Sequence, residues 1–408
     1  EANQTYPKFS ASFVPSDLDF WENAFGDNAI NALKLRASWG QAGNLTGIGS
    51  YDRFWQFLPV AYLGRPTIIP SSTLANPNVA PERMTELEYG ADITVWRNKV
   101  NIGATFYQQK IKDLVVNRVL AASEGGLGIV NNVGEMENKG IELSLSVTPI
   151  STNDLTWGVT FLYNRNRNKI TELGSPTIAI ANVAGAPSFL IEGMPASVFY
   201  GTAFARDNGQ ILLTPAGLIQ SEKGVQNSAT PLVYEAQRDN TGQPTGAAIR
   251  AVIGNPNPDF TGSIMSNLAY KNFNFSFLID FVRGVDVFNA DKRTRQGVGI
   301  GDYAEKELKG EVPRGYIFAM YTTEEWRIDD GSFTKLREIS LSYNFKRPVK
   351  GINNINLGVF GRNLISWDNY NGYDPETNAG GNSDILRGVD FGNVPIPRTY
   401  KMQLVVTF

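Results

Sequence analysis

The chain has 408 residues, with 37 lysines and arginines against 40 aspartates and glutamates, and a formal charge of −3. This near-neutral balance, with a single basic cluster at 292–295, gives no support to nucleic-acid binding. Cysteine and histidine are both absent from the sequence, which excludes disulfides, zinc–thiolate sites and catalysis by Ser-His-Asp or HExxH groups. No run approaches the roughly 18 apolar residues that a membrane helix needs.

Segments in which apolar and polar residues alternate recur along the whole chain. In one of them, Ile141, Leu143 and Leu145 share a face, while Glu142 and Ser144 share the other. Successive side chains of a β-strand point to opposite faces, so each segment predicts a strand with one apolar face. We expect roughly eleven strands, at 6–13, 33–39, 85–96, 99–109, 137–149, 155–165, 260–271, 273–283, 333–346, 354–363 and 398–408.

Short and long connections alternate between these strands. The short ones are Arg97-Asn98, 151–154, Asn272 and a turn around Pro348 and Gly351. The long ones are 44–84, 110–136, 166–259, 284–332 and 364–397. Structureless connections above about 15 residues are uncommon in compact soluble domains. Outer-membrane barrels, in contrast, have short turns on the periplasmic side and long loops outside the cell, so the alternation favours a membrane barrel.

The expected fold is all-β, an antiparallel transmembrane β-barrel with short periplasmic turns and long extracellular loops. Charged residues on the polar faces would line a wet lumen, while the apolar faces contact lipid: Glu86, Glu88, Asp92, Glu142 and Asp280. Aromatic residues gather near strand ends, as in interfacial girdles, although ordinary core packing is the alternative: Trp39, Trp96, Trp157, Tyr163, Tyr343, Phe345 and Phe408. A soluble or surface-exposed β-sandwich, acting as a ligand-binding module or adhesin, stays open as the rival fold.

Seven motifs run through nearly the whole chain in a fixed order. They are LKLRASWGQAGN (33–44), NVGEMENKGIEL (132–143), IGNPNPDF (253–260), DGSFTKLR (330–337), GRNL (361–364), GYDPE (372–376) and PIPRT (395–399). In these motifs the chain resembles the C-terminal barrel portion of the SusC/RagA family of TonB-dependent transporters from Bacteroidetes.

The resemblance implies that residues 1–408 are the C-terminal part of the barrel, about half of a barrel of about 22 strands. The N-terminal plug and the first strands would lie outside this sequence. Strands 6–13 and 398–408 are therefore expected to pair with other strands and not with each other.

The function that the resemblance implies is nutrient import across the outer membrane of a Gram-negative bacterium. The substrate would be an oligosaccharide or a peptide, the energy would come from the TonB-ExbB-ExbD complex, and a SusD-like lipoprotein would cap the barrel. The last strand ends on Phe408, and the resemblance implies that this aromatic end is the signal read by the barrel-assembly machinery.

Aromatic residues in the long loops are the candidates for substrate contacts, because ring faces stack on sugars and on apolar peptide side chains. These candidates are Phe54, Trp55, Phe57, Trp326, Trp367 and Tyr370. The alternative is that such rings pack the loops together or anchor the protein at the membrane interface. Tyr373 lies inside a motif and is assigned a structural role.

No catalytic constellation is found, so the chain is predicted not to be an enzyme, and to have no cofactor and no metal. The acidic pairs 324–325 and 329–330 are interpreted as solvated loop acids and not as acid–base groups. At 238–246, where family members often carry a calcium-like loop, this chain offers only Asp239 and Asn240 as early ligands. A polar turn is the favoured interpretation of that stretch.

Overall fold

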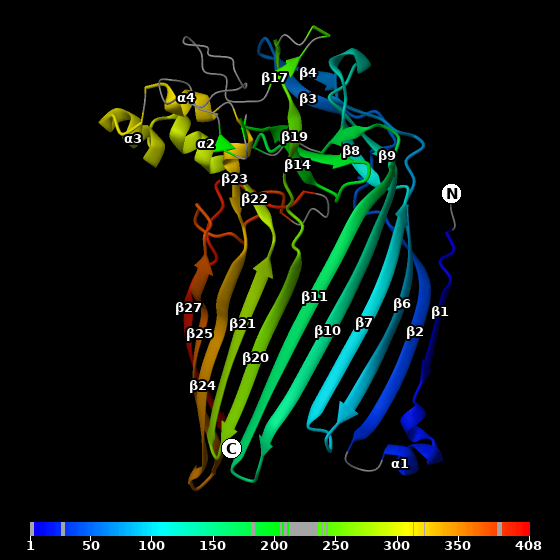
Figure 1. Cartoon of the computed structure of the whole chain (residues 1–408), viewed down its shortest axis with the longest axis vertical. Coiled ribbons are helices and arrows are strands. Elements are labelled where there is room, and N and C mark those ends of the chain that lie inside the picture. The colour runs from blue at the N-terminus through cyan, green and yellow to red at the C-terminus, as the bar shows by residue number, and fades with distance from the viewer. Residues whose placement is uncertain are drawn as a thin grey trace.

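The computed structural model describes residues 4–25, 29–180, 184–204, 206–207, 210–211, 236–238, 240–241, 244–312, 314–321, 323–381 and 386–408. One antiparallel sheet of eleven strands forms a tall wall (Figure 1). In order of pairing, its strands are β1 (Lys8–Phe13), β2 (Ile30–Asn44), β6 (Glu82–Val95), β7 (Val100–Lys112), β10 (Gly134–Ser151), β11 (Leu155–Leu173), β20 (Phe260–Tyr270), β21 (Phe273–Arg283), β24 (Phe333–Val349), β25 (Ile352–Asp368) and β27 (Thr399–Thr407). Every strand predicted from the alternation is present, and the all-β prediction is confirmed.

The two ends of this sheet are open edges. Strand β1 pairs with β2, and β27 pairs with β25, but β1 and β27 do not pair with each other. Figure 1 shows them on opposite sides of the wall, β1 in blue and β27 in red. The sheet is therefore part of a barrel that does not close within the described residues, as predicted.

The two faces of the sheet differ in polarity. Arg36 on β2 and Arg337 on β24 line the same hollow of about 620 Å³, so the sheet curves and its polar face is concave. On this face Arg36 forms an ion pair with Glu88, and the Arg337 guanidinium donates to the Asp280 carboxylate at 2.8 Å. Two of the five acids that the sequence assigned to a wet lumen, Glu88 and Asp280, are therefore paired with arginines.

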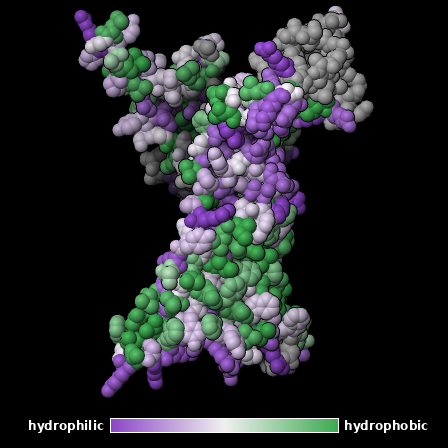
Figure 2. Space-filling view, turned by 90° about the vertical axis from the view of Figure 1, so that its left-hand side faces the viewer, coloured by the Kyte–Doolittle hydropathy of each residue, from purple (hydrophilic) through white to green (hydrophobic). Residues whose placement is uncertain are grey.

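The outer face of the sheet is apolar and exposed. Tyr89 and Phe106 lie opposite each other on β6 and β7, and their ring centroids stack 5.6 Å apart. Figure 2 shows mostly hydrophobic side chains over the lower part of the molecule, where the sheet lies, with hydrophilic ones along the bottom edge and a mixture richer in hydrophilic ones above. An apolar band bounded by polar surface in this way is typical of a protein face that contacts lipid.

The short turns lie at one end of the wall and require unusual backbone angles. Between β6 and β7, residues Trp96, Arg97 and Asn98 all have positive φ, and Lys271 does so between β20 and β21. Left-handed angles of this kind let the turn of a tight hairpin match the twist of its two strands. The first connection at this end is longer and holds a 3-10 helix η1 (Pro15–Asp17) and α1 (Asp19–Phe25).

The segments predicted as long loops lie at the other end and contain secondary structure of their own (Figure 1). Three small sheets are present: β5 (Thr73–Leu74), β9 (Gly128–Asn132) and β8 (Val115–Val119); β12 (Thr177–Ala179), β13 (Ser188–Ile191), β14 (Val198–Thr202) and β19 (Arg250–Gly254); β23 (Ile328–Asp330), β22 (Asp286–Asn289) and β26 (Val389–Asp390). The two-stranded pairs are β3 (Phe57–Tyr62) with β4 (Arg65–Pro70), β15 (Arg206–Asp207) with β16 (Gln210–Ile211), and β17 (Ala236–Arg238) with β18 (Pro244–Ala248).

Short helices complete these outer connections. They are η2 (Ala122–Glu124), α2 (Ala290–Gly297), α3 (Asp302–Lys309), α4 (Tyr316–Tyr321) and η3 (Glu325–Arg327). Within the described part of the chain, none of the helices is both long enough and apolar enough to cross a membrane.

The hydrophobic clusters of the described residues lie at the outer end of the molecule, and one of them includes Ile170 and Leu173 near the end of β11. One cluster of buried side chains joins three of these connections: Phe199 from 174–259, Phe288 from 284–332, and Leu386 with Val389 from 369–398. Phe199 and Phe288 are completely buried, with ring centroids 5.8 Å apart. These connections therefore pack together as a body that sits on one end of the wall.

The alternation on β10 gives a paired test of which face contacts lipid. Leu143 lies opposite Tyr163 on the apolar face, whereas the Ser144 hydroxyl and the Asp92 carboxylate flank Gly103 on the polar face. Leu143→Arg should destabilise the full-length protein by about 2 to 4 kcal/mol, because a charge near the midplane must leave water. Ser144→Arg should change little, since water reaches that face. Equal losses in the free energy of unfolding for both variants would contradict the assignment of the faces.

Candidate functional site

Three of the predicted ligand-contact aromatics lie exposed at the outer end of the molecule. Phe54, Trp55 and Phe57 are 66%, 58% and 59% exposed, and they precede or begin the β3–β4 hairpin. Trp367, near the end of β25, is also about half exposed. These rings are free to meet a ligand, and their role in binding stays a prediction.

The other two predicted contacts are buried inside the outer connections. Trp326 is 6% exposed and packs with Phe204 and Met320, edge-on to the ring of Tyr303. Tyr370 is 8% exposed, and its hydroxyl donates to the Asp390 carboxylate at 2.6 Å. Burial, followed by this hydrogen bond, raises the pKa of Tyr370 above its ordinary value. Both residues hold loops together in this structure, which is the alternative that the sequence left open.

Three of the four acids in the acidic pairs are not solvated loop acids, which corrects the sequence interpretation for them, whereas Asp330 is exposed. Glu324 accepts from the Thr202 backbone N–H at 2.8 Å, and Glu325 forms an ion pair with Arg206. Asp329 pairs with Lys292 at 2.8 Å, and both of these side chains are nearly buried. Glu324, Glu325 and Asp329 were misread because their partners lie 122, 119 and 37 residues away in the sequence. Each of these contacts joins two segments of the chain, and none has the geometry of an acid–base pair.

Two of the sequence motifs meet at the top of β24. Lys335 from the DGSFTKLR motif is buried, with its ammonium 2.5 Å from Asp374 and 3.1 Å from Glu376 of the GYDPE motif. Arg337, two residues along the strand, also contacts Glu376, at 2.7 Å. The backbone N–H of Ile396 donates to Asp374 at 3.2 Å, which adds the PIPRT motif to the same cluster. The motifs thus fasten the 369–398 connection to the wall.

This network changes the protonation of Asp374. Burial on its own disfavours the charged carboxylate, but hydrogen bonds from Lys335 and from the backbone N–H groups of Glu376 and Ile396 outweigh burial. The pKa of Asp374 therefore lies below its ordinary value of 3.8. The carboxylate stays ionised under all but strongly acidic conditions.

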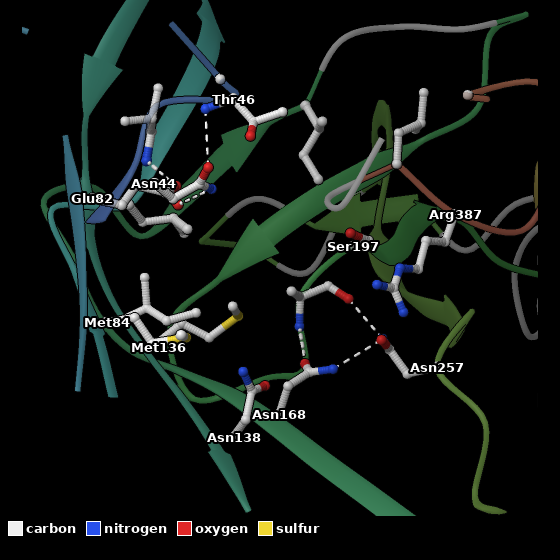
Figure 3. Close-up of a pocket in the computed structure, with 18 of the residues that line it drawn as sticks. Asn44, Thr46, Glu82, Met84, Met136, Asn138, Asn168, Ser197, Asn257 and Arg387 are labelled. Atoms are coloured by element: carbon white, nitrogen blue, oxygen red, sulfur yellow. Dashed lines mark hydrogen bonds between the residues drawn. The ribbon is translucent and has the colours of Figure 1, made fainter. Parts of the chain in front are cut away.

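A cavity of about 810 Å³ opens where the strands of the wall reach the outer connections. Its walls come from the ends of β2, β6, β7, β10 and β11, together with residues near 196, 257 and 386. Asparagine is the commonest residue of the lining: Asn44, Asn117, Asn138, Asn166, Asn168 and Asn257. Met84 and Met136 add flexible apolar surface (Figure 3). A cavity of this size can hold a small ligand, and its asparagine amides can donate hydrogen bonds to the polar groups of that ligand and accept them.

Part of the amide lining is fixed by contacts within the protein. Asn168 Nδ2 donates to Asn257 Oδ1 at 2.8 Å, and Asn168 Oδ1 accepts from the Ala196 N–H at 2.7 Å. Asn257 Nδ2 in turn donates to the Ala196 carbonyl at 2.7 Å (Figure 3). This ring of hydrogen bonds ties strand β11 to two outer segments, so the shape of the cavity is preorganised.

The opposite wall is fixed in the same manner around Glu82. Its carboxylate accepts from Asn44 Nδ2 and from the Val115 N–H, both at 2.8 Å. Asn44 also accepts from the Thr46 N–H at 2.9 Å. Both oxygens of Glu82 therefore have protein donors.

Comparison with known proteins decides the family. Residues 1–364 match the family described as "TonB dependent receptor-like, beta-barrel". The chain belongs to this family. It is 28% identical to the TonB-dependent receptor P3 of Formosa agariphila over 97% of its length, and 23% identical to the TonB-dependent receptor SusC of Bacteroides thetaiotaomicron over 99%. The resemblance to SusC-type proteins drawn from the motifs is confirmed.

Solved structures of the same type share the fold of this TonB-dependent receptor barrel. The structure of the RagAB peptide transporter superposes with a TM-score of 0.75, at 20% identity over 99% of this chain and 43% of that one. The chain spans 42% of the length of the receptor P3 and 40% of SusC. An open sheet of eleven strands agrees with such partial coverage.

The cavity could not be predicted from the sequence, although three of the motifs contribute residues to its lining. Asn44, Asn138 and Asn257 each belong to a quoted motif, but no spacing rule brings amides from 44, 138 and 257 together. In the described residues, no group of three or more acidic side chains has the geometry to hold a metal ion. Asp239, one of the two early ligands of the weak calcium signal, lies outside the described residues.

The contrast between buried and exposed tryptophans can be tested directly. Trp326→Ala removes a buried ring and should destabilise the protein by about 3 kcal/mol, the usual cost of a large cavity. Trp55→Ala should leave stability unchanged, because its ring is exposed. Thermal unfolding of the full-length receptor measures both, and a similar drop in Tm for the two variants would contradict these placements.

The Asp374 cluster predicts a local pH dependence. Because the folded pKa lies below 3.8, the ionised carboxylate adds stability above about pH 4, and this stability is lost as the pH falls through the folded pKa. Hydrogen exchange, corrected for intrinsic rates, should show residues 369–398 losing protection below about pH 4. Asp374→Asn should lose that protection already at pH 7, because it leaves the buried Lys335 with Glu376 alone.

The control for this measurement is Glu311→Gln, a change to an exposed acid elsewhere in the outer connections. It should follow the wild-type profile at every pH. Protection of 369–398 that does not change with pH, or that is equal in Asp374→Asn and the wild type, would rule out this role for the cluster.

Proposed function

We propose that the chain forms part of an outer-membrane importer of the SusC/RagA type, which takes up oligosaccharides or peptides by TonB-dependent transport. The observation that carries this proposal is the open eleven-stranded sheet, apolar outside and polar inside, in a chain of the TonB-dependent receptor family. A wall of this kind separates lipid from an aqueous interior, and in water it would expose a large apolar surface.

In this proposal, residues 1–408 are the C-terminal part of the barrel in the outer membrane of a Gram-negative bacterium. The rest of the protein supplies the plug, the remaining strands and the contact with the TonB-ExbB-ExbD complex. A SusD-like lipoprotein caps the outer connections. The name of the RagAB peptide transporter supports peptides as one class of candidate substrate.

Assembly of the barrel would follow the family in the same way. Phe408 comes directly after β27 and is 81% exposed, so its ring is accessible to another protein. We keep it as the proposed signal for the barrel-assembly machinery. The open edges of β1 and β27 then pair with strands from the rest of the barrel, which leaves no unpaired backbone in lipid.

A soluble β-sandwich module or an adhesin fits the structure less well. A sandwich buries one face of each sheet against another sheet, and the described residues place no second sheet of comparable size over the outer face. Exposed rings on that face, such as Tyr89 and Phe106, would be unfavourable in water.

Deletion of the gene in its native host tests the proposal. Two labelled mixtures are offered to the deletion strain, one of peptides and one of oligosaccharides, and uptake of at least one of them should be lost. The full-length gene should restore that uptake. Loss of TonB should have the same effect, because transport depends on that energy source. The full-length protein should fractionate with the outer membrane and co-purify with a lipoprotein. A water-soluble protein, or uptake that survives both deletions, would refute the proposal.

A further inference from the structure

Arg387 lies at the edge of the asparagine-lined cavity on a backbone segment that is held at both sides. Leu386, the residue before it, is 4% exposed and packs in the cluster with Phe199 and Phe288. The carbonyl of Gly388, the residue after it, accepts from the Phe288 N–H at 2.8 Å. The position of Arg387 is therefore set by the core of the outer connections.

The guanidinium of Arg387 differs from the other arginines along the inner surface. Arg36 and Arg337 each pair with a carboxylate of the protein. Arg387 makes neither a hydrogen bond nor an ion pair with any residue that the structure describes. Figure 3 shows its side chain extending toward Asn257 in the cavity.

Among the described residues that line the cavity, no other group is free to neutralise this charge. Glu82 is the one carboxylate among the described lining residues, and both of its oxygens already accept protein hydrogen bonds. In Figure 3 it lies on the opposite side of the view from Arg387. Within the part of the chain that the structure describes, the cavity therefore presents an unpaired cation at one end of a neutral, hydrogen-bonding surface.

We propose that this cavity binds the carboxylate end of an oligomeric ligand, with Arg387 as the residue that recognises the carboxylate. A guanidinium and a carboxylate form two parallel hydrogen bonds, which fix the orientation of the ligand as well as its charge. The amides of Asn138 and Asn166 then meet the polar body of the ligand, and Met84 and Met136 meet its apolar groups. This inference rests on the proposed import function and specifies the ligand of that importer.

A carboxylate end can belong to a peptide or to an acidic oligosaccharide, and the lining favours the peptide. Among the described residues that line the cavity, none is aromatic, although aromatic residues make up 11% of the chain. Sugar rings are commonly held by stacking on aromatic faces, which this lining does not provide. A short peptide needs hydrogen-bonding partners for its backbone and apolar surface for its side chains. The asparagine amides provide the first, and the aliphatic and methionine side chains of the lining provide the second.

Binding to the purified full-length receptor tests the proposal with matched probes. The first pair is an acetylated alanine–leucine tetrapeptide with a free C-terminal carboxylate and the same peptide as its amide. The second pair is tetragalacturonic acid and its methyl ester. Wild-type protein should bind the free peptide at least about tenfold more tightly than the amide, because a charge-assisted bidentate contact is lost.

The arginine itself is tested with three variants. Arg387→Gln should bring the affinities for peptide acid and amide within about twofold of each other, and Arg387→Lys should restore part of the difference. Arg314→Gln, which changes an exposed arginine outside the cavity, should behave as wild type. An Arg387→Gln protein that loses affinity for acid and amide equally would indicate a structural role and overturn the proposal.

The remaining outcomes separate this inference from the import function. If tetragalacturonic acid binds in an Arg387-dependent way and the peptide does not, the carboxylate site stands and the preference for peptides is wrong. If neither acid shows Arg387-dependent binding, the proposal is overturned even when cells import substrate. Arg387-dependent binding in a protein that supports no TonB-dependent uptake would instead reject the import function and keep the site.

Discussion

Backbone hydrogen bonding between neighbouring antiparallel strands is the constraint on which the rest of this structure depends. In lipid, an unpaired N–H or C=O group costs several kcal/mol, so a membrane wall must satisfy its backbone strand by strand. The eleven strands do this through a meander in which each strand pairs with the next strand of the wall along the chain. The two-residue period of the side chains follows from that pairing, and it separates an apolar outer face from a charged concave face.

The outer connections are built on a different principle, since they have little backbone pairing with the wall. They rely on a buried core of their own and on single polar contacts at the ends of strands. The Lys335 cluster holds one connection, and the Asn168–Asn257 ring holds another. Each of these contacts joins a residue of the wall to a residue of a connection. The sequence motifs supply several of these residues, which gives the motifs a structural role independent of any ligand.

The sequence predicted the wall well because strand alternation is a local signal. A strand such as 137–149 shows its faces within its own residues, and its short turn marks where it ends. The connections gave no such signal. The strands of the small sheets that join them are only two to five residues long, which is too short for an alternation to be recognised. Lys335 and Asp374 are 39 residues apart, and Asn168 and Asn257 are 89 apart, so nothing local in the sequence links them. For the same reason Trp326 and Tyr370 could not be distinguished from exposed loop aromatics such as Trp55.

The cluster that joins Phe199, Phe288 and Val389 has a consequence for how such receptors diversify. These three residues belong to three successive outer connections, yet they pack in one core, and β22 also pairs with β26 across two of these connections. A recombination event that exchanged one connection alone would bring a foreign surface into that core. New specificities on this side of the barrel are therefore expected to be inherited as blocks that carry all three connections, whereas the β3–β4 hairpin, which lies outside that cluster, is free to vary by itself.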